Sequence, residues 1–154
     1  MKVVLQRVTE ATVQVGDRSV GAIGHGLLAL VGVSPEDSSA TVDWMADKIV
    51  GLRIFADEHK PMNRSVLDVG GAVLVVSQFT LSADTRRGKR PSFTSAAAPE
   101  LARQLYEQLV TRLAEHVPVA TGEFGADMQV KLINDGPVTF VLESPPQVQQ
   151  TPAG

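Results

Sequence analysis

Two uninterrupted apolar runs constrain the fold of this 154-residue chain more than any other feature. They cover residues 26–33, with the sequence GLLALVGV, and residues 71–76, with the sequence GAVLVV. Each run is too continuous for a strand with one solvated face and too short for a typical helix. We therefore expect both segments to be central strands of a sheet, buried on both faces.

Two helices are predicted by apolar residues that recur at helical spacing. The first begins after Ser38 or Ser39, either of which can act as the N-cap, and ends near Arg53. Its apolar residues are Val42, Met45, Ala46, Ile49 and Leu52. The second begins at Pro99, a residue favoured in the first helical position, and ends before Pro118. Its leucines form an i, i+4 stripe made of Leu101, Leu105, Leu109 and Leu113.

Shorter segments of alternating or apolar character predict additional strands. These segments are residues 3–8, 12–15, 19–23, 54–56, 128–133 and 138–142. Two helices and six or more strands in mixed order indicate a sheet packed against helices, of the α/β or α+β class. The pattern leaves the strand order open.

The length fits a single domain, which we expect to span residues 1–143. Residues 144–154 are rich in proline and glutamine and lack apolar periodicity, so they are predicted to be a flexible tail. The chain has no cysteine, which excludes disulfides, thiolate zinc sites, iron–sulfur clusters and a cysteine nucleophile. A domain of this size can bury a sizeable core without a disulfide or a metal.

Charge and hydropathy restrict the partners. The formal net charge is -3 and the isoelectric point is about 5.6, which argues against a protein that grips a long phosphate backbone. Contact with one nucleic-acid end stays open. The apolar runs are far shorter than the roughly 20 residues that span a bilayer, and the N-terminal residues do not resemble a signal peptide. We expect a cytoplasmic protein that does not contact a membrane.

Familiar catalytic sets are missing from the sequence. His25, His59 and His116 do not stand at metal-ligand spacing from one another or from carboxylates. No serine-hydrolase elbow, phosphate-binding loop or zinc-protease motif is present. A Ser-His-Asp mechanism is therefore poorly supported, and no metal or other cofactor is predicted.

The first segment suited to chemistry follows the second apolar run. Ser77, Gln78, Phe79 and Thr80 come directly after Val76, so a buried strand would hold them in place while the next loop leaves them accessible. The segment offers two hydroxyls, one side-chain amide and backbone N–H groups that could face a developing oxyanion. The alternative is an ordinary strand end with turn-favouring hydroxyls.

Two more segments have suitable chemistry. Arg86, Arg87, Lys89 and Arg90 place four cations within five positions, which suits a phosphate or the terminal nucleotides of an RNA. The alternative is a solvated loop. Residues 134–139 read as a turn between strands, yet a glycine before a proline, as in Gly136-Pro137, also permits a carbonyl to project into a site.

Taken in order, these segments resemble the D-aminoacyl-tRNA deacylase family, and the likeness runs from Met1 to about Glu143. The segments that carry it are residues 6–8 (QRV), 26–28 (GLL), 53–55 (RIF), 62–63 (MN), 77–81 (SQFTL), 90–93 (RPSF), 126–130 (ADMQV) and 134–139 (NDGPVT). Each motif alone is weak, whereas the complete ordered set is specific.

The resemblance implies a mixed, mainly antiparallel sheet packed against two helices in one domain. It implies hydrolysis of the ester that joins a D-amino acid, or glycine, to the terminal adenosine of tRNA. It also implies a homodimer with active sites at the subunit interface. The catalytic pocket falls on residues 77–80, and a Gly-cisPro motif inserted from the partner subunit to exclude L-amino acids falls on Gly136 and Pro137. Arg7 is expected to hold that motif, and Phe79 and Met128 to line the pocket.

Three functional hypotheses and two mechanisms remain open at this stage. The chain is a deacylase, a nucleic-acid-binding module without catalysis, or a hydrolase of free D-amino-acid esters or peptides with Thr80 as nucleophile. A threonine nucleophile needs a nearby base, and the sequence suggests none. We therefore favour attack by the terminal ribose 2′-OH, or by a water that it positions, with backbone N–H groups near Phe79 and Thr80 holding the oxyanion.

Overall fold

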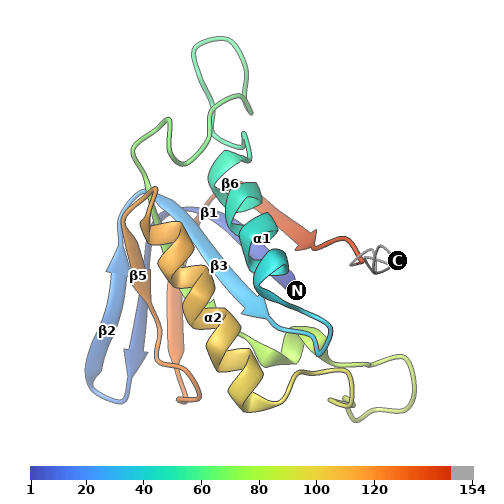
Figure 1. Ribbon diagram of the computed structural model, residues 1–154. Helices are drawn as coiled ribbons and strands as arrows, with labels where there is room; N and C mark the ends of the chain where they lie inside the picture. The colour runs from blue at the N-terminus through green and yellow to red at the C-terminus, as the bar shows by residue number, and fades with distance from the viewer. Residues whose placement is uncertain (147–154) are drawn as a thin grey trace, which may run out of the picture.

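The computed structural model describes residues 1–146, and its centre is a six-stranded mixed sheet (Figure 1). In chain order the strands are β1 (Lys2–Val15), β2 (Arg18–Ile23), β3 (Gly26–Gly32), β4 (Ala72–Ser77), β5 (Val119–Thr121) and β6 (Gln129–Glu143). Two helices, α1 (Ser39–Gly51) and α2 (Pro99–Ala114), lie side by side in front of the sheet. A short 3-10 helix, η1 (Phe79–Ser82), follows β4.

The strand order is β2-β1-β3-β4-β5, and β6 pairs with β1 along nearly its whole length. β1 is antiparallel to β2, β3 and β6, whereas β3 with β4 and β4 with β5 are parallel. The prediction of a mixed, mainly antiparallel sheet with two helices is confirmed.

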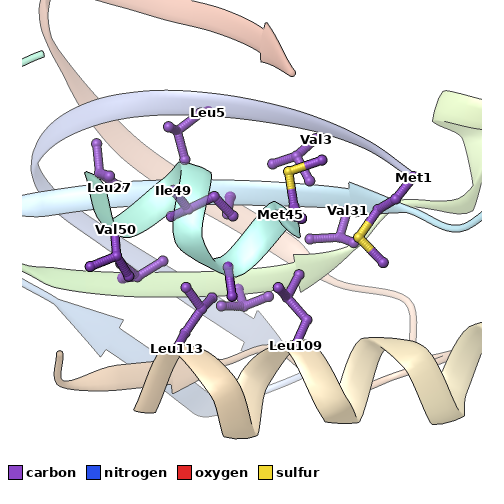
Figure 2. Close-up of a cluster of buried hydrophobic side chains, with 14 of the residues drawn as sticks. Met1, Val3, Leu5, Leu27, Val31, Met45, Ile49, Val50, Leu109 and Leu113 are labelled. Atoms are coloured by element: carbon purple, nitrogen blue, oxygen red, sulfur yellow. The ribbon is translucent and has the colours of Figure 1, made fainter. Parts of the chain in front are cut away.

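The two apolar runs form the neighbouring central strands β3 and β4, as predicted. Their alternate side chains enter two separate cores, one on each face of the sheet. Leu27, Ala29 and Val31 point into the larger core beneath the helices, and Leu28 joins the smaller core on the opposite face. Figure 2 shows the larger core, where side chains of α1 and α2 meet those of β1 and β3. Burial on both faces explains why neither run alternates with polar residues.

The helices follow the predicted pattern closely. α1 has Ser38 as its N-cap, and Ser38 forms a reciprocal capping box with Thr41. α2 begins at Pro99 and ends before the predicted limit. The buried residues of α2 include Leu105, Leu109 and Leu113 of the predicted stripe. No helix within residues 1–146 is long and apolar enough to cross a membrane.

Several strand predictions are wrong in detail. Residues 3–8 and 12–15 belong to the single strand β1, and residues 128–133 and 138–142 are spanned by the single strand β6 from Gln129 onwards. Shifts in the β1–β6 register near Arg7 and Thr9 absorb the irregular segment instead of ending either strand. Residues 54–56 form no strand and contribute one isolated bridge, Phe55 to Arg64. β5 was not predicted.

A close approach between β2 and β5 depends on a glycine. A Cβ atom on Gly21 would lie 2.2 Å from the carbonyl oxygen of Thr121 in β5, so only glycine permits this contact. β2 and β5 accordingly lie next to each other in Figure 1, although neither pairs with the other in the sheet. Gly21 lies inside the predicted strand 19–23, which the structure extends by one residue to Arg18.

The predicted tail begins with a residue that is bound to the domain. Ser144 donates a backbone hydrogen bond to the Met1 carbonyl, and its hydroxyl accepts one from the Met1 ammonium at 2.8 Å. Residues 147–154 of the predicted tail lie outside the described residues. The domain boundary at residue 143 stays a prediction.

Candidate active site

An apolar cavity of about 460 Å³ lies at the C-terminal end of β4. Ser77, Gln78 and Phe79 form one wall, and Phe124 and Met128 line it from the segment before β6. The rest of the lining is mostly small or aliphatic: Val31, Val33, Val76, Ala96, Ala97, Pro99, Ala102, Gly125, Ala126 and Val130. The start of α2 therefore contributes to this apolar cavity together with the ends of β3 and β4.

The segment after β4 is held by its backbone. Gln78 N–H donates to the Val31 carbonyl at 2.7 Å, which extends the pairing of β4 with β3 by one residue. The chain then turns into η1, where Leu81 N–H donates to the Gln78 carbonyl at 3.1 Å. Within residues 1–146, the N–H groups of Phe79 and Thr80 donate no hydrogen bond. Two adjacent unpaired donors beside a cavity are suited to binding an oxyanion.

Thr80 is exposed, and it is not among the residues that line the apolar cavity. In the described part of the chain, its hydroxyl contacts only the side-chain amide of Gln78. An amide is not a base, so this contact does not activate a threonine nucleophile.

Two phenylalanines stand at the surface beside the cavity. Phe79 is 59% exposed, and its ring packs against that of Phe93 with the centroids 5.2 Å apart. Phe93 belongs to the RPSF motif, but nothing in the sequence pattern indicated that it touches residue 79. This contact joins the loop that contains the basic residues to the end of β4.

Gly136 and Pro137 lie in an irregular part of β6, and the peptide bond between them is cis. Both residues are exposed. Arg7 donates through Nε to the Asp135 carbonyl at 3.0 Å and through Nη1 to the Ile54 carbonyl at 2.7 Å. Arg7 thereby connects the glycine–proline segment to the chain after α1.

The glycine–proline segment and the apolar cavity are far apart in one chain. Val130 at the start of β6 pairs with Val13 and lines the cavity, whereas Asn134 beside the glycine–proline segment pairs with Val8, five residues farther along β1 or about 16 Å away. Ser77 is level with Val31 and Val3, which is four residues or about 13 Å along β1 from Arg7. Met128 lies at the cavity, whereas Arg7, Gly136 and Pro137 do not line it.

The basic residues lie in a loop beyond η1 that is closed by a bridge between Asp84 and Ser92. Arg86 donates to both carboxylate oxygens of Asp84, at 2.9 and 2.8 Å, and this contact lowers the pKa of Asp84 to about 2. Arg87, Lys89 and Arg90 are exposed. No group of three or more His, Cys, Asp or Glu residues in residues 1–146 is arranged to hold a metal ion.

The sequence indicated Ser77, Gln78, Phe79 and Met128, all of which line the apolar cavity. It did not indicate the contributions from residues 96–102 or from Phe124. The latter lies between Gly122 and Gly125, and this glycine-flanked aromatic is the one local signal that was available.

Comparisons with known proteins agree on one family. The family model described as D-Tyr-tRNA(Tyr) deacylase matches residues 4–143. A curated protein named D-aminoacyl-tRNA deacylase from Alcanivorax borkumensis is 60% identical over 144 residues, which cover 93% of this chain and 99% of the relative. One of the same name from Teredinibacter turnerae is 57% identical, with 94% of this chain and 100% of the relative covered.

Two solved structures share the fold. One is named c-Myc DNA Unwinding Element Binding Protein and matches with a TM-score of 0.89 and 42% identity, covering 95% of this chain and 100% of the other. The second is described as a probable eukaryotic D-amino acid tRNA deacylase. It matches with a TM-score of 0.80, covers 92% of this chain and 97% of the other, and at 16% identity supports the fold alone.

Proposed function

The chain belongs to the D-Tyr-tRNA(Tyr) deacylase family, and we infer that it is a D-aminoacyl-tRNA deacylase, which hydrolyses the ester between a D-amino acid and tRNA. We propose that the reaction takes place at the apolar cavity. The observation that carries this assignment is the pair of unpaired N–H groups, those of Phe79 and Thr80, beside a cavity large enough for a nucleoside.

In this proposal, the two N–H groups bind the ester carbonyl oxygen as it becomes an oxyanion. A water molecule, positioned by the 2′-OH of the terminal ribose, attacks the carbonyl carbon. The bond to the ribose 3′-oxygen then breaks, that oxygen takes up the proton released by the attacking water, and the free D-amino acid leaves. Thr80 contributes its backbone N–H, and its side chain is not required as a nucleophile because, among residues 1–146, its hydroxyl is hydrogen-bonded to the Gln78 amide alone.

Chirality would be read by the main-chain oxygens of Gly136 and Pro137. The two enantiomers of an aminoacyl group differ in where the side chain and the hydrogen point, so a rigid backbone oxygen on the L side rejects by collision. Arg7 supports this role because it bonds the neighbouring Asp135 carbonyl. Glycine has no side chain, so the same filter would admit glycyl-tRNA.

The filter would have to come from a second copy of the chain. Gly136 and Pro137 are three strands away from β4 in their own subunit, yet both are exposed and available to a partner. Ile133 and Val141 on β6 are 53% and 61% exposed, which is unusual for large aliphatic residues in a sheet. We therefore propose a homodimer that buries β6 and completes each cavity with the partner's glycine–proline segment.

The tRNA itself would be held near its 3′ end. Arg86, Arg87, Lys89 and Arg90 lie in the loop that Phe93 joins to Phe79, so they can meet the phosphates adjacent to the terminal adenosine. Contacts limited to the 3′ end of the tRNA explain how an acidic protein binds RNA. The activity would belong to the cytoplasm, where tRNA is charged.

The direct test measures release of D-tyrosine from D-Tyr-tRNA and of L-tyrosine from L-Tyr-tRNA by the purified full chain. We expect rapid hydrolysis of the D-ester and background hydrolysis of the L-ester. Equal hydrolysis of both would remove the chiral filter, and hydrolysis of neither would remove the deacylase assignment.

The DNA-binding name of one similar structure supports a second candidate, a nucleic-acid-binding module without catalysis. That function predicts salt-dependent binding of duplex DNA with no turnover of D-Tyr-tRNA. The net charge of -3 counts against it. A filter-binding titration against salt, run beside the hydrolysis assay, separates the two functions.

A further inference from the structure

A second hollow adjoins the apolar cavity and differs from it in chemistry. It has a volume of about 340 Å³, and we call it the polar recess. Its lining consists of Lys2, Ser34, Leu81, Ser82, Ala83, Asp84, Thr85, Arg86 and Ser95. None of these residues lines the apolar cavity.

Three chain segments pass directly from one hollow to the other. Val33 lines the apolar cavity and Ser34 the polar recess. Ala96 likewise lines the apolar cavity and its neighbour Ser95 the polar recess. In η1, Phe79 lines the apolar cavity and Leu81 the polar recess. Neighbouring Cα atoms are about 3.8 Å apart, so the two hollows share a border one or two residues wide. Along two of these segments the chain changes from apolar to hydroxyl-bearing at that border.

The groups in the polar recess suit a single phosphodiester. Ser34, Ser82, Thr85 and Ser95 supply hydroxyls, and Lys2 and Arg86 supply two positive charges against the one negative charge of Asp84. The net formal charge of the lining is therefore +1, and Lys2 is also paired with Glu143, which lies outside the lining, at 3.3 Å. An apolar or strongly cationic ligand fits this lining poorly.

Asp84 orients the Arg86 guanidinium and leaves one of its nitrogen atoms, Nη1, available to a ligand. The carboxylate receives Arg86 Nε and Nη2, so the guanidinium is held in one direction. Within residues 1–146, Nη1 of Arg86 has no hydrogen-bond partner. A guanidinium held by an acid on one edge can bind a phosphate oxygen with the other edge.

We propose that the polar recess binds the phosphodiester that joins the terminal adenosine of tRNA to the preceding nucleotide. This proposal rests on the proposed function, because it takes the apolar cavity as the site of the aminoacyl-adenosine. The 5′ phosphate of a nucleoside is attached directly to its ribose, so a nucleoside bound in the apolar cavity with its 5′ carbon at the shared border places that phosphate in the polar recess. Lys2, Arg86 and Ser95 are then specificity residues for a polynucleotide substrate.

The test compares three small esters of D-tyrosine with the wild-type protein. The first is the ester of adenosine, the second that of the dinucleotide CpA, and the third that of CpA with an uncharged methylphosphonate linkage. We expect the CpA ester to have a kcat/KM about tenfold above that of the adenosine ester, as one charge-assisted contact would give. The methylphosphonate ester should fall back to the adenosine value.

Substitutions in the polar recess then test whether this recess causes the higher kcat/KM of the CpA ester. Lys2→Gln, Arg86→Ala and Ser95→Ala should each reduce the advantage of CpA over adenosine, and the double variant of Lys2 and Arg86 should abolish it. Hydrolysis of the adenosine ester by the Lys2→Gln and Ser95→Ala variants should not change, because neither residue lines the apolar cavity. Arg112→Ala is the matched control, because Arg112 is an exposed, ion-paired arginine that lines neither hollow. Ser95→Ala keeps the test valid if the charge variants misfold, because it removes one loop hydroxyl and leaves the ion pair of Lys2 with Glu143 intact.

The outcomes separate the two proposals. If the wild-type protein hydrolyses D-Tyr-tRNA but treats the three small esters alike, the polar recess is not a phosphate site and the deacylase function stands. The proposal for the polar recess is also overturned if the variants lower hydrolysis of the adenosine and CpA esters equally, because the substitutions then affect the hydrolysis step and not the binding of the phosphodiester. A wild-type protein that hydrolyses neither D-Tyr-tRNA nor any ester overturns the proposed function, and the recess proposal with it.

Discussion

At the scale of single residues, the site relies on main-chain atoms more than on reactive side chains. Phe79 and Thr80 offer their N–H groups, and Gly136 and Pro137 would offer their carbonyls. Backbone groups held in η1 and in β6 cannot rotate away as side chains do, so they suit a filter that separates mirror images. The side chain at residue 80 is the clearest place to test this view.

Replacing Thr80 by alanine removes the hydroxyl and keeps the backbone N–H. Because the Gln78 amide is the one partner of this hydroxyl in the described part of the chain, we expect the single-turnover rate on D-Tyr-tRNA to fall by less than about tenfold, the effect of one lost hydrogen bond. Removing a covalent nucleophile typically costs about 10⁴-fold or more. A loss of that size, with the variant still folded by circular dichroism, would restore Thr80 to the role of nucleophile.

At the scale of elements, α2 contributes to the wall of the apolar cavity through its first turn and packs on the sheet through its buried leucines. Tyr106 adds a directional link, because its hydroxyl donates to the Val75 carbonyl in β4 at 2.8 Å. The same carbonyl also accepts from Gly122 N–H at 3.1 Å. α2, β4 and the segment after β5 therefore meet at one carbonyl oxygen.

Tyr106→Phe tests that link and the pH dependence of stability. Burial, with a smaller effect from Glu107, raises the pKa of Tyr106 to about 12. The unfolded tyrosine ionises near 10, so the stability it contributes is complete below pH 10 and is lost as the pH rises toward 12. The variant should lose about 1 kcal/mol at pH 7, since Val75 keeps its second donor, and should show a flatter decline above pH 10.

Urea unfolding at pH 7 and at several values between 10 and 12 measures both effects. Tyr106 is the only tyrosine in the chain, so tyrosinate absorbance reports its ionisation directly. Ionisation near pH 10 in the folded wild-type protein would contradict the raised pKa.

Elements with a strong local pattern could be predicted from the sequence. β3, β4, α1 and α2 bury enough of their own side chains to produce continuous or helical apolar patterns. β5 has three residues and exists because it pairs with β4, so no local periodicity marks it. The continuity of β1 and β6 likewise depends on their mutual pairing across an irregular register.

The site residues also divide into those that a local sequence pattern marks and those that tertiary packing brings together. Ser77 to Phe79 could be found because they directly follow a recognisable buried strand. Phe124 and residues 96–97 line the cavity through tertiary packing that no local pattern encodes. The separation of Gly136 from the cavity follows from the strand order, which the sequence pattern left open.

At the scale of the whole molecule, one subunit has the parts of the proposed site in two places. The cavity lies at the end of β4, and the glycine–proline segment lies on β6, whose one partner strand within residues 1–146 is β1. An edge strand with exposed aliphatic residues is a natural surface for association with another copy. Assembly would then be a condition for chirality as well as for stability.

Ile133→Glu places a charge in the proposed interface on a side chain that is 53% exposed within the subunit. The fold of the monomer should tolerate this change, whereas burying an unpaired carboxylate between two subunits costs several kcal/mol. We expect sedimentation velocity to show a dimer for the wild-type protein and a monomer of 16.4 kDa for the variant. Discrimination between D-Tyr-tRNA and L-Tyr-tRNA should fall sharply in the monomer.

Leu67→Glu, at a residue 51% exposed and outside β6, is the matched control and should leave both mass and discrimination unchanged. A monomeric variant that still rejects L-Tyr-tRNA would show that each subunit carries its own filter, which would rule out the partner's glycine–proline segment in that role.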